Sequence, residues 1–202
     1  MEPSPASETP LRVLYLGRLS PEKGVDVLLR AWALLIHSPS SENVADNHSS
    51  PVIRHSSLTI VGDGHERPAL EALAAELGIS GQVEFTGALP RSAAFAMLST
   101  ASLLVFPSVW YEQFAITPIE AMSLGVPILV SDVARFGTIV ENGVTGRFFP
   151  PGSPAALATA IRELLSDPTG LRRMGEAART AFEASDCVPS RNLKRLLDIY
   201  NV

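Results

Sequence analysis

Short apolar runs alternate with helical segments along most of the chain, and this alternation constrains the fold more than any other feature. The runs expected to form strands are 11–16, 58–61, 83–86, 102–106, 127–131 and 146–149. The segments expected to form helices are 25–36, 67–77, 92–99, 117–124, 154–165 and two more near the end of the chain, the last at 192–200. This order predicts an α/β fold: a doubly wound, mainly parallel six-stranded sheet with helices on both faces.

Glycines and turns directly follow several of the expected strands. Gly17 ends the first strand, and Gly62 ends the second. The carboxyl ends of parallel strands meet at one edge of a doubly wound sheet, and ligands bind there. We therefore expect the loops after the strands to converge in one crevice.

Length and composition are typical of a single globular domain. The chain has 202 residues, of which 46% are hydrophobic and 18% are charged. A chain of this size can bury a substantial core. We expect residues 1–10 to be a disordered tail or linker and residues 11–202 to be one domain. Within that domain, a serine-rich stretch at about 37–57 is expected to be a flexible insertion.

Several kinds of protein and site do not fit this composition. The net charge of −5 argues against a broad surface for nucleic acid. The single cysteine, Cys187, cannot form an internal disulfide, and the four scattered histidines lack zinc-ligand spacing. The uncharged run 92–111 contains several serines and a proline, which favours a buried helix and strand over a transmembrane segment. The first residues do not resemble a signal peptide, and we expect a cytoplasmic location.

Two glutamates eight positions apart, Glu112 and Glu120, lie across the start of the helix expected at 117–124. A helix N-terminus attracts phosphate, because its first amides lack partners and its dipole is positive there. Carboxylates accept hydrogen bonds from sugar hydroxyls. Arg18 and Lys23 follow the first expected strand, and an arginine fork with a lysine point charge suits a diphosphate. The pattern therefore predicts a site for a sugar linked to a diphosphate.

Four short motifs, in order, resemble those of retaining glycosyltransferases with the GT-B fold, especially family four (group 1). Residues 112–120, EQFAITPIE, are similar to the E-x7-E motif of that family. Residues 17–24 resemble its first phosphate loop, residues 61–64 its second glycine-rich turn, and residues 83–87 the strand and turn before its nucleobase site. The resemblance covers the C-terminal, donor-binding half of such an enzyme, a Rossmann-like half of the GT-B fold.

The resemblance implies a role for each residue of a donor site. Glu120 would accept hydrogen bonds from both ribose hydroxyls, and Glu112 would hold the hydroxyls of the donor sugar. Arg18 and Lys23 would stabilise the departing nucleoside diphosphate, so these two and Glu112 are the residues expected to act in catalysis. The other expected donor-binding residues are Gly17, Gly62, Leu89 through its backbone, Phe114, Ala115 and Ile116 through their N–H groups, and Thr117 through its hydroxyl.

Ala115 departs from the pattern, because the family usually has glycine at this position. Glycine permits a close backbone approach and a positive φ, so alanine could narrow the sugar pocket or alter donor choice. The neighbouring Trp110 and Tyr111 are expected to pack in the core or within the loop rather than to stack on a base. No metal is expected, because no Asp-x-Asp pair occurs and arginine, lysine and a helix dipole replace the metal in GT-B enzymes.

The resemblance implies transfer of a glycosyl group from a nucleoside-diphosphate sugar to a hydroxyl acceptor, with retention of configuration. The acceptor site of such enzymes lies mostly in an N-terminal domain, which we expect to be supplied in cis or in trans. Any peripheral membrane contact would come through that domain. The chain alone is expected to bind the donor and to transfer little.

Three alternatives remain open. The chain could be a non-catalytic nucleotide-binding or regulatory subunit that has kept the pocket, which Ala115 and the absent half mildly favour. It could be another enzyme on a related fold. A nucleotide-sugar epimerase would need acid and base groups beside the sugar, and no such groups are found. A phosphorylase would need a lysine that anchors pyridoxal phosphate, and no lysine is placed for that role. The third alternative is a flavodoxin-like module that shares only its fold with the glycosyltransferases.

Overall fold

The computed structural model describes residues 10–37, 56–111, 115–133, 140–185 and 187–188. Its strands form one sheet in the order β3-β2-β1-β4-β5-β6, and every neighbouring pair is parallel. The strands are β1 (Arg12–Leu16), β2 (Ser57–Val61), β3 (Val83–Gly87), β4 (Leu103–Phe106), β5 (Ile128–Ser131) and β6 (Arg147–Phe149). The predicted doubly wound, six-stranded sheet is confirmed.

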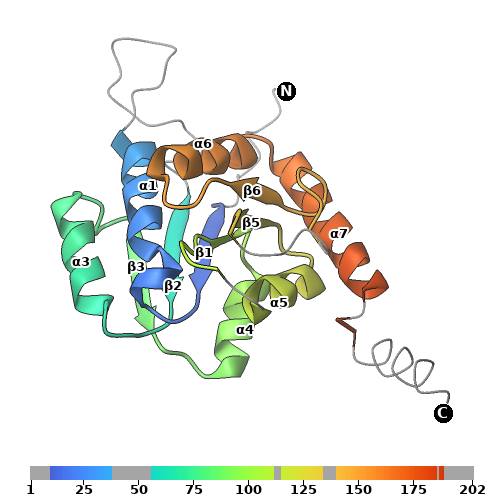
Figure 1. Ribbon diagram of the computed structural model, residues 1–202, viewed down its shortest axis with the longest axis horizontal. Helices are drawn as coiled ribbons and strands as arrows, with labels where there is room; N and C mark the ends of the chain where they lie inside the picture. The colour runs from blue at the N-terminus through green and yellow to red at the C-terminus, as the bar shows by residue number, and fades with distance from the viewer. Residues whose placement is uncertain (1–9, 38–55, 112–114, 134–139, 186, 189–202) are drawn as a thin grey trace, which may run out of the picture.

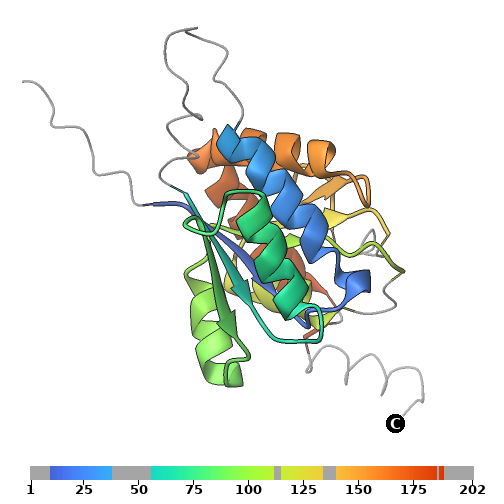
Figure 2. The ribbon, with the colours of Figure 1, turned by 90° about the vertical axis from the view of Figure 1, so that its left-hand side faces the viewer.

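Helices cover both faces of this sheet (Figures 1 and 2). One face carries α1 (Val25–His37), α3 (Arg67–Glu76) and α6 (Pro154–Leu165). The other carries α4 (Arg91–Ser99), α5 (Ile116–Leu124) and the second half of α7 (Pro168–Ala184). The first half of α7 packs in the first core through Leu171 and Met174. A short 3-10 helix, η1 (Pro21–Lys23), lies between β1 and α1. The sequence predicted this three-layer arrangement because strand and helix signals alternate.

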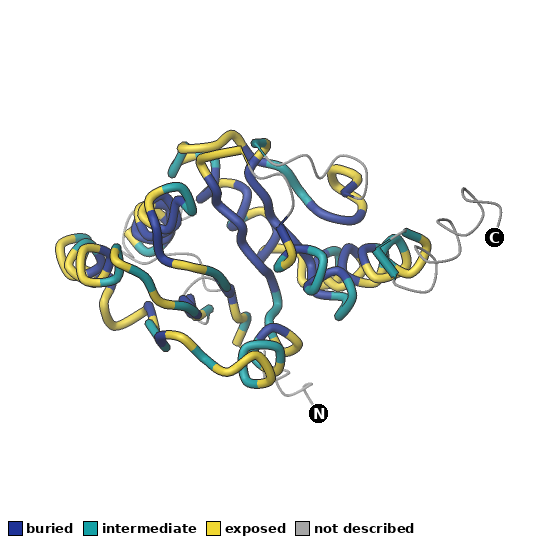
Figure 3. Tube along the Cα trace, turned by 60° about the horizontal axis from the view of Figure 1, so that its bottom comes forward, coloured by how far each residue is buried: buried dark blue, intermediate teal, exposed yellow. Residues whose placement is uncertain are grey.

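The central strands are buried on both faces, as the dark blue tube in Figure 3 shows. Val13 and Tyr15 of β1 face the core beneath α1, whereas Leu14 between them faces the core beneath α5. All four residues of β4 are buried, and so are all four of β5. Strands covered on both faces have nearly continuous apolar sequences, which is why these runs are recognisable in the sequence.

The helix ends predicted for α1, α3, α4, α5 and α6 differ from the observed ones by at most one residue. α4 begins at Arg91 and α5 at Ile116, each one residue earlier than expected. Gly125 follows α5 with a φ of 72°, the left-handed conformation that glycine supplies at a helix C-terminus. The hydroxyl of Ser153 caps α6 by accepting a hydrogen bond from the amide of Ala156 at 3.3 Å.

Some predictions fall on residues outside the described part of the chain. These are most of the tail at 1–10, most of the insertion at 37–57 and the last helix at 192–200. His37 and Ser57, at the ends of the predicted insertion, belong to α1 and β2. In the described residues, no helix has the length and hydropathy needed to span a membrane.

Candidate functional site

The loops after β1, β2, β3 and β4 all leave the sheet at the same edge, because the strands are parallel. The strand order reverses between β1 and β4, and this switch point is where doubly wound sheets bind ligands. The expected residues that lie on these loops or in the helices that follow them are Gly17, Arg18, Lys23, Gly62, Leu89, Ala115, Ile116, Thr117 and Glu120. Glu112 and Phe114 lie outside the described residues.

The loops after β1 and β2 pack directly against each other. The amide of Gly17 donates to the carbonyl of Val61 at 3.0 Å, and the amide of Leu19 donates to that of Asp63 at 2.9 Å. A Cβ atom at Gly62 would lie 1.8 Å from the carbonyl oxygen of Gly17. Gly62 therefore packs between the two loops, and this role does not depend on any contact with a ligand.

Arg18 and Lys23 lie on either side of an internal network in the first loop. The Arg18 guanidinium is 3.2 Å from the carboxylate of Glu22, and the hydroxyl of Ser20 donates to the same carboxylate oxygen at 2.6 Å. The Ser20 hydrogen bond, assisted by Arg18 and Lys23, lowers the pKa of Glu22 below its ordinary value. The Lys23 ammonium lies 5.7 Å from the ring centroid of Phe106, a cation–π contact.

Glu22 also joins the first loop to the loop after β4. Its backbone carbonyl accepts hydrogen bonds from the amide of Val109 and from the hydroxyl of Ser108, both at 2.9 Å. Ser131, at the end of β5, donates through its hydroxyl to the carbonyl of Ser108 at 2.5 Å. These bonds cross the switch point and hold Arg18 and Lys23 in place beside the segment that leads to α5.

The N-terminus of α5 faces the same edge of the sheet. Ala115 is the N-cap residue, and its side chain has no oxygen that could cap the first amides. Its φ of −105° and ψ of 117° lie in the extended region, which any residue adopts. The positive φ that would require glycine is therefore absent at Ala115, which is 7% exposed.

Glu120 makes an ion pair that was not expected. Its Oε1 atom accepts a hydrogen bond at 2.8 Å from the guanidinium of Arg91, the first residue of α4. The side chain of Glu120 is 21% exposed and that of Arg91 is 85% exposed. The two residues are 29 positions apart, so no local sequence signal could have found Arg91. Glu22, in contrast, is four residues from Arg18, a spacing at which opposite charges often pair.

Arg67 lies between the loop after β2 and the end of β3. Its guanidinium contacts Asp63 at 3.3 Å and Glu71 at 2.8 Å, and the Glu71 hydrogen bond raises the pKa of Arg67. A Cβ atom at Gly87 would lie 2.7 Å from the same guanidinium. Arg67 therefore fixes the turn that precedes Leu89.

The prediction for Trp110 and Tyr111 is wrong. Both side chains are exposed, Trp110 to 71% and Tyr111 to 51%. They lie on the segment between β4 and α5, at the same edge of the sheet as Arg18. The sequence favoured packing because aromatic residues after an apolar strand most often enter a core.

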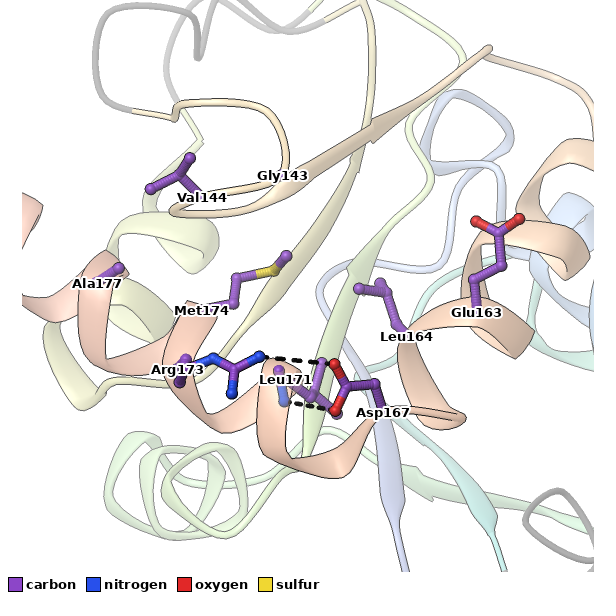
Figure 4. A pocket seen from close by; sticks show the side chains of 10 residues that line it. Gly143, Val144, Glu163, Leu164, Asp167, Leu171, Arg173, Met174 and Ala177 are labelled. Carbon is purple, nitrogen blue, oxygen red and sulfur yellow. Dashed lines mark hydrogen bonds and ion pairs between the residues drawn. The ribbon is translucent and has the colours of Figure 1, made fainter.

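A hollow of about 420 Å³ lies at the opposite edge of the sheet (Figure 4). It is formed by the turn before β6, the end of α6 and the first half of α7, and Asp167 pairs with Arg173 beside it. None of the expected site residues lines it. In the described part of the chain, no three or more His, Cys, Asp or Glu residues are grouped to hold a metal ion.

The structure is an α/β domain whose described candidate site residues follow the carboxyl ends of the strands of a doubly wound sheet. The chain belongs to the family "Glycosyl transferases group 1", whose model matches residues 1–181. Its fold is the Rossmann-like half of a GT-B glycosyltransferase, as the resemblance implied.

Similar proteins include several bacterial glycosyltransferases. The chain is 34% identical over 82% of its length to the α-D-kanosaminyltransferase of Streptomyces kanamyceticus. It is 37% identical over 94% of its length to a D-inositol 3-phosphate glycosyltransferase of Nocardia farcinica. It spans 39% and 40% of the lengths of these two relatives. The crystal structure of Anabaena HepE in complex with UDP superposes with a TM-score of 0.79 over 96% of this chain and 50% of HepE, at 22% identity.

Proposed function

We propose that this chain is the donor-binding domain of a retaining glycosyltransferase that takes a nucleoside-diphosphate sugar. The observation that supports the proposal is that Arg18, Lys23 and α5, the helix of Glu120, all follow strands that end at the same edge of the sheet, and that the Ala115 side chain does not cap α5. Two cations and a helix N-terminus suit a diphosphate, and a partly buried carboxylate suits ribose hydroxyls. The complex of HepE with UDP supports the same class of ligand.

In the proposed reaction, the bond between the anomeric carbon and the diphosphate breaks as the acceptor hydroxyl attacks from the same face. Arg18 and Lys23 stabilise the negative charge that builds on the departing diphosphate, and the amide of Ile116 and the hydroxyl of Thr117 add donors. Glu120 holds the ribose and Glu112 the donor sugar, which orients the reacting carbon. Gly17, Gly62, Leu89, Phe114 and Ala115 form the rest of the donor site in this proposal.

The acceptor comes from a second domain in this proposal. The chain spans only about 40% of the relatives it matches, which supports an N-terminal acceptor domain in cis or in trans. We therefore expect the purified chain to bind donor but to transfer little. Acceptor-dependent glycosyl transfer by the purified chain alone would contradict this part of the proposal. We propose a cytoplasmic location, which the lone, free Cys187 supports.

A non-catalytic nucleotide-binding subunit is the second candidate. Ala115, at a position where the family usually has glycine, favours it. The two candidates differ in one result. The test joins an acceptor domain to this chain. If the chain is the donor-binding domain of an enzyme, the joined protein transfers the glycosyl group. If the chain is a non-catalytic subunit, the joined protein binds nucleotide without turnover.

Calorimetric titration with UDP, GDP and ADP tests the donor site. We expect one of the three to bind wild type, and we expect Glu120→Ala to abolish that binding. Glu176→Ala, which removes an exposed carboxylate from α7, is the matched control and should bind as wild type does. Failure of all three nucleotides to bind the wild-type chain would contradict the proposed donor site.

A further inference from the structure

Arg91 lies where the expected base and ribose sites meet. It follows Leu89 and Pro90 directly and begins α4, so its side chain starts at the carboxyl edge of the sheet. From there it reaches across to α5, which lies beside α4 on the same face (Figure 1). The contact that it makes is the 2.8 Å hydrogen bond to Oε1 of Glu120.

The ion pair occupies only part of the Glu120 carboxylate. An ionised carboxylate has about four acceptor positions on its two oxygens. In the described part of the chain, the recorded hydrogen bond to this carboxylate uses Oε1, so Oε2 remains available to a ligand. With 21% of the side chain exposed, the carboxylate is accessible at the edge where the ligand would lie.

Arg91 contributes little to the folded state by itself. Its side chain is 85% exposed, and ion pairs with an exposed partner add little to folding stability, because water screens them and ordering two long side chains costs entropy. Arg91 is therefore better explained by the orientation that it gives to Glu120. Arginine suits that task, because its planar fork has a fixed geometry that a lysine ammonium lacks.

We propose that Arg91 is a positioning residue for nucleotide binding: it holds Oε1 of Glu120 so that Oε2 meets the ribose hydroxyls. This inference rests on the proposed function and adds a residue to its site. A carboxylate whose side-chain torsions are already restrained loses less entropy when the ribose binds.

The test is a comparison of ribose and dideoxyribose ligands by calorimetry. The ligands are the nucleoside diphosphate that binds wild type and its 2′,3′-dideoxy form, which lacks the hydroxyls that Glu120 would hold. We expect Arg91→Ala to weaken binding of the ribose form by about three- to tenfold, the loss typical of one hydrogen bond. Binding of the dideoxy form should change less than about twofold.

Two further variants and a stability measurement complete the design. Arg172→Ala removes a similarly exposed arginine from α7 and should bind both ligands as wild type does. Arg91→Lys should behave more like the alanine variant than like wild type, because the fork is lost while the charge remains. The melting temperature of Arg91→Ala should stay within about 2 °C of wild type.

Several outcomes would overturn the inference. Equal weakening of both ligands would mean that Arg91 acts on the diphosphate or the base. Unchanged affinity would mean that it has no role in binding, and tighter binding would mean that it competes with the nucleotide for Glu120. If wild type binds a nucleotide and Glu120→Ala does not, any of these results contradicts only the role proposed for Arg91, and the proposed donor site stands. If wild type binds none, the proposed function fails as well.

Discussion

At the scale of single residues, glycines and a few hydrogen-bonding side chains determine how the loops of the site fit together. Gly62 has a φ of 136° and touches the backbone of Gly17, so it joins the loops after β1 and β2. Glu22 binds Ser20 and Arg18 through its carboxylate and the loop after β4 through its carbonyl. Both residues hold the loop after β1, which carries Arg18 and Lys23, against a neighbouring loop.

Gly62→Ala should disrupt the folded protein. The new Cβ would lie 1.8 Å from a carbonyl oxygen, and alanine rarely adopts this φ, so we expect a loss of at least about 2 kcal/mol in unfolding free energy. Gly81→Ala is the matched control, because no atom lies within 4 Å of its Cβ position. Its effect should stay within about 0.5 kcal/mol. Equal stability of the two variants in urea would contradict the packing role of Gly62.

Ser20→Ala should raise the pKa of the Glu22 carboxyl toward its ordinary value, because the Ser20 hydroxyl is the largest cause of the lowered pKa. A carboxyl with a lowered pKa stabilises the folded state above its unfolded pKa, and this contribution is lost as the pH falls through the folded pKa. The variant should therefore lose less stability than wild type on acidification below about pH 4.5. NMR titration of the Glu22 carboxyl measures the shift directly, and an unchanged pKa would contradict this account.

At the scale of elements, the close approach of α5 and α7 fixes the helix that carries Glu120. A Cβ atom at Gly175, inside α7, would lie 2.1 Å from the carbonyl oxygen of Gly125, the residue that ends α5. At the other end of α5, the extended backbone of Ala115 accepts alanine without strain. The position of α5 relative to the sheet is therefore set by its packing against α7 as well as by its loops.

Gly175→Ala should destabilise the protein, although glycine is a poor helix former. In an exposed helix, replacing glycine with alanine stabilises by about 1 kcal/mol. Here the new methyl group forces α7 away from α5, and overpacking of this kind costs about 1–3 kcal/mol. Urea denaturation measures the difference. A variant more stable than wild type would show that α7 can move away from α5 without loss.

At the scale of the whole molecule, one sheet separates two cores and carries the candidate site at a single edge. The core beneath α1, α3 and α6 and the core beneath α4, α5 and α7 share the central strands β1 and β4. Nucleotide bound at the switch point would contact loops whose strands belong to both cores. Binding should therefore stabilise the domain as a unit.

A saturating nucleoside diphosphate should raise the melting temperature of the whole domain. At a free concentration of 100 times Kd, binding adds about 2.7 kcal/mol to the unfolding free energy. For a domain of this size, that corresponds to a rise of about 5–10 °C, measured by scanning calorimetry. Glu120→Ala should lose the rise at the same ligand concentration. A rise of the same size in this variant would show that the stabilising site lies elsewhere.

The sequence alone determined the set of six parallel strands, the helices on both faces and the edge of the sheet where the expected site residues gather. It could do so because buried parallel strands and the glycines that end them leave local patterns. Only the tertiary structure decided that Glu120 pairs with Arg91, that Glu22 joins two loops and that Trp110 and Tyr111 are exposed. The first two contacts join residues that are far apart in the chain, and the exposure of the third pair depends on which neighbours cover the side chains. The packing of whole helices and strands determines the contacts as well as the exposure.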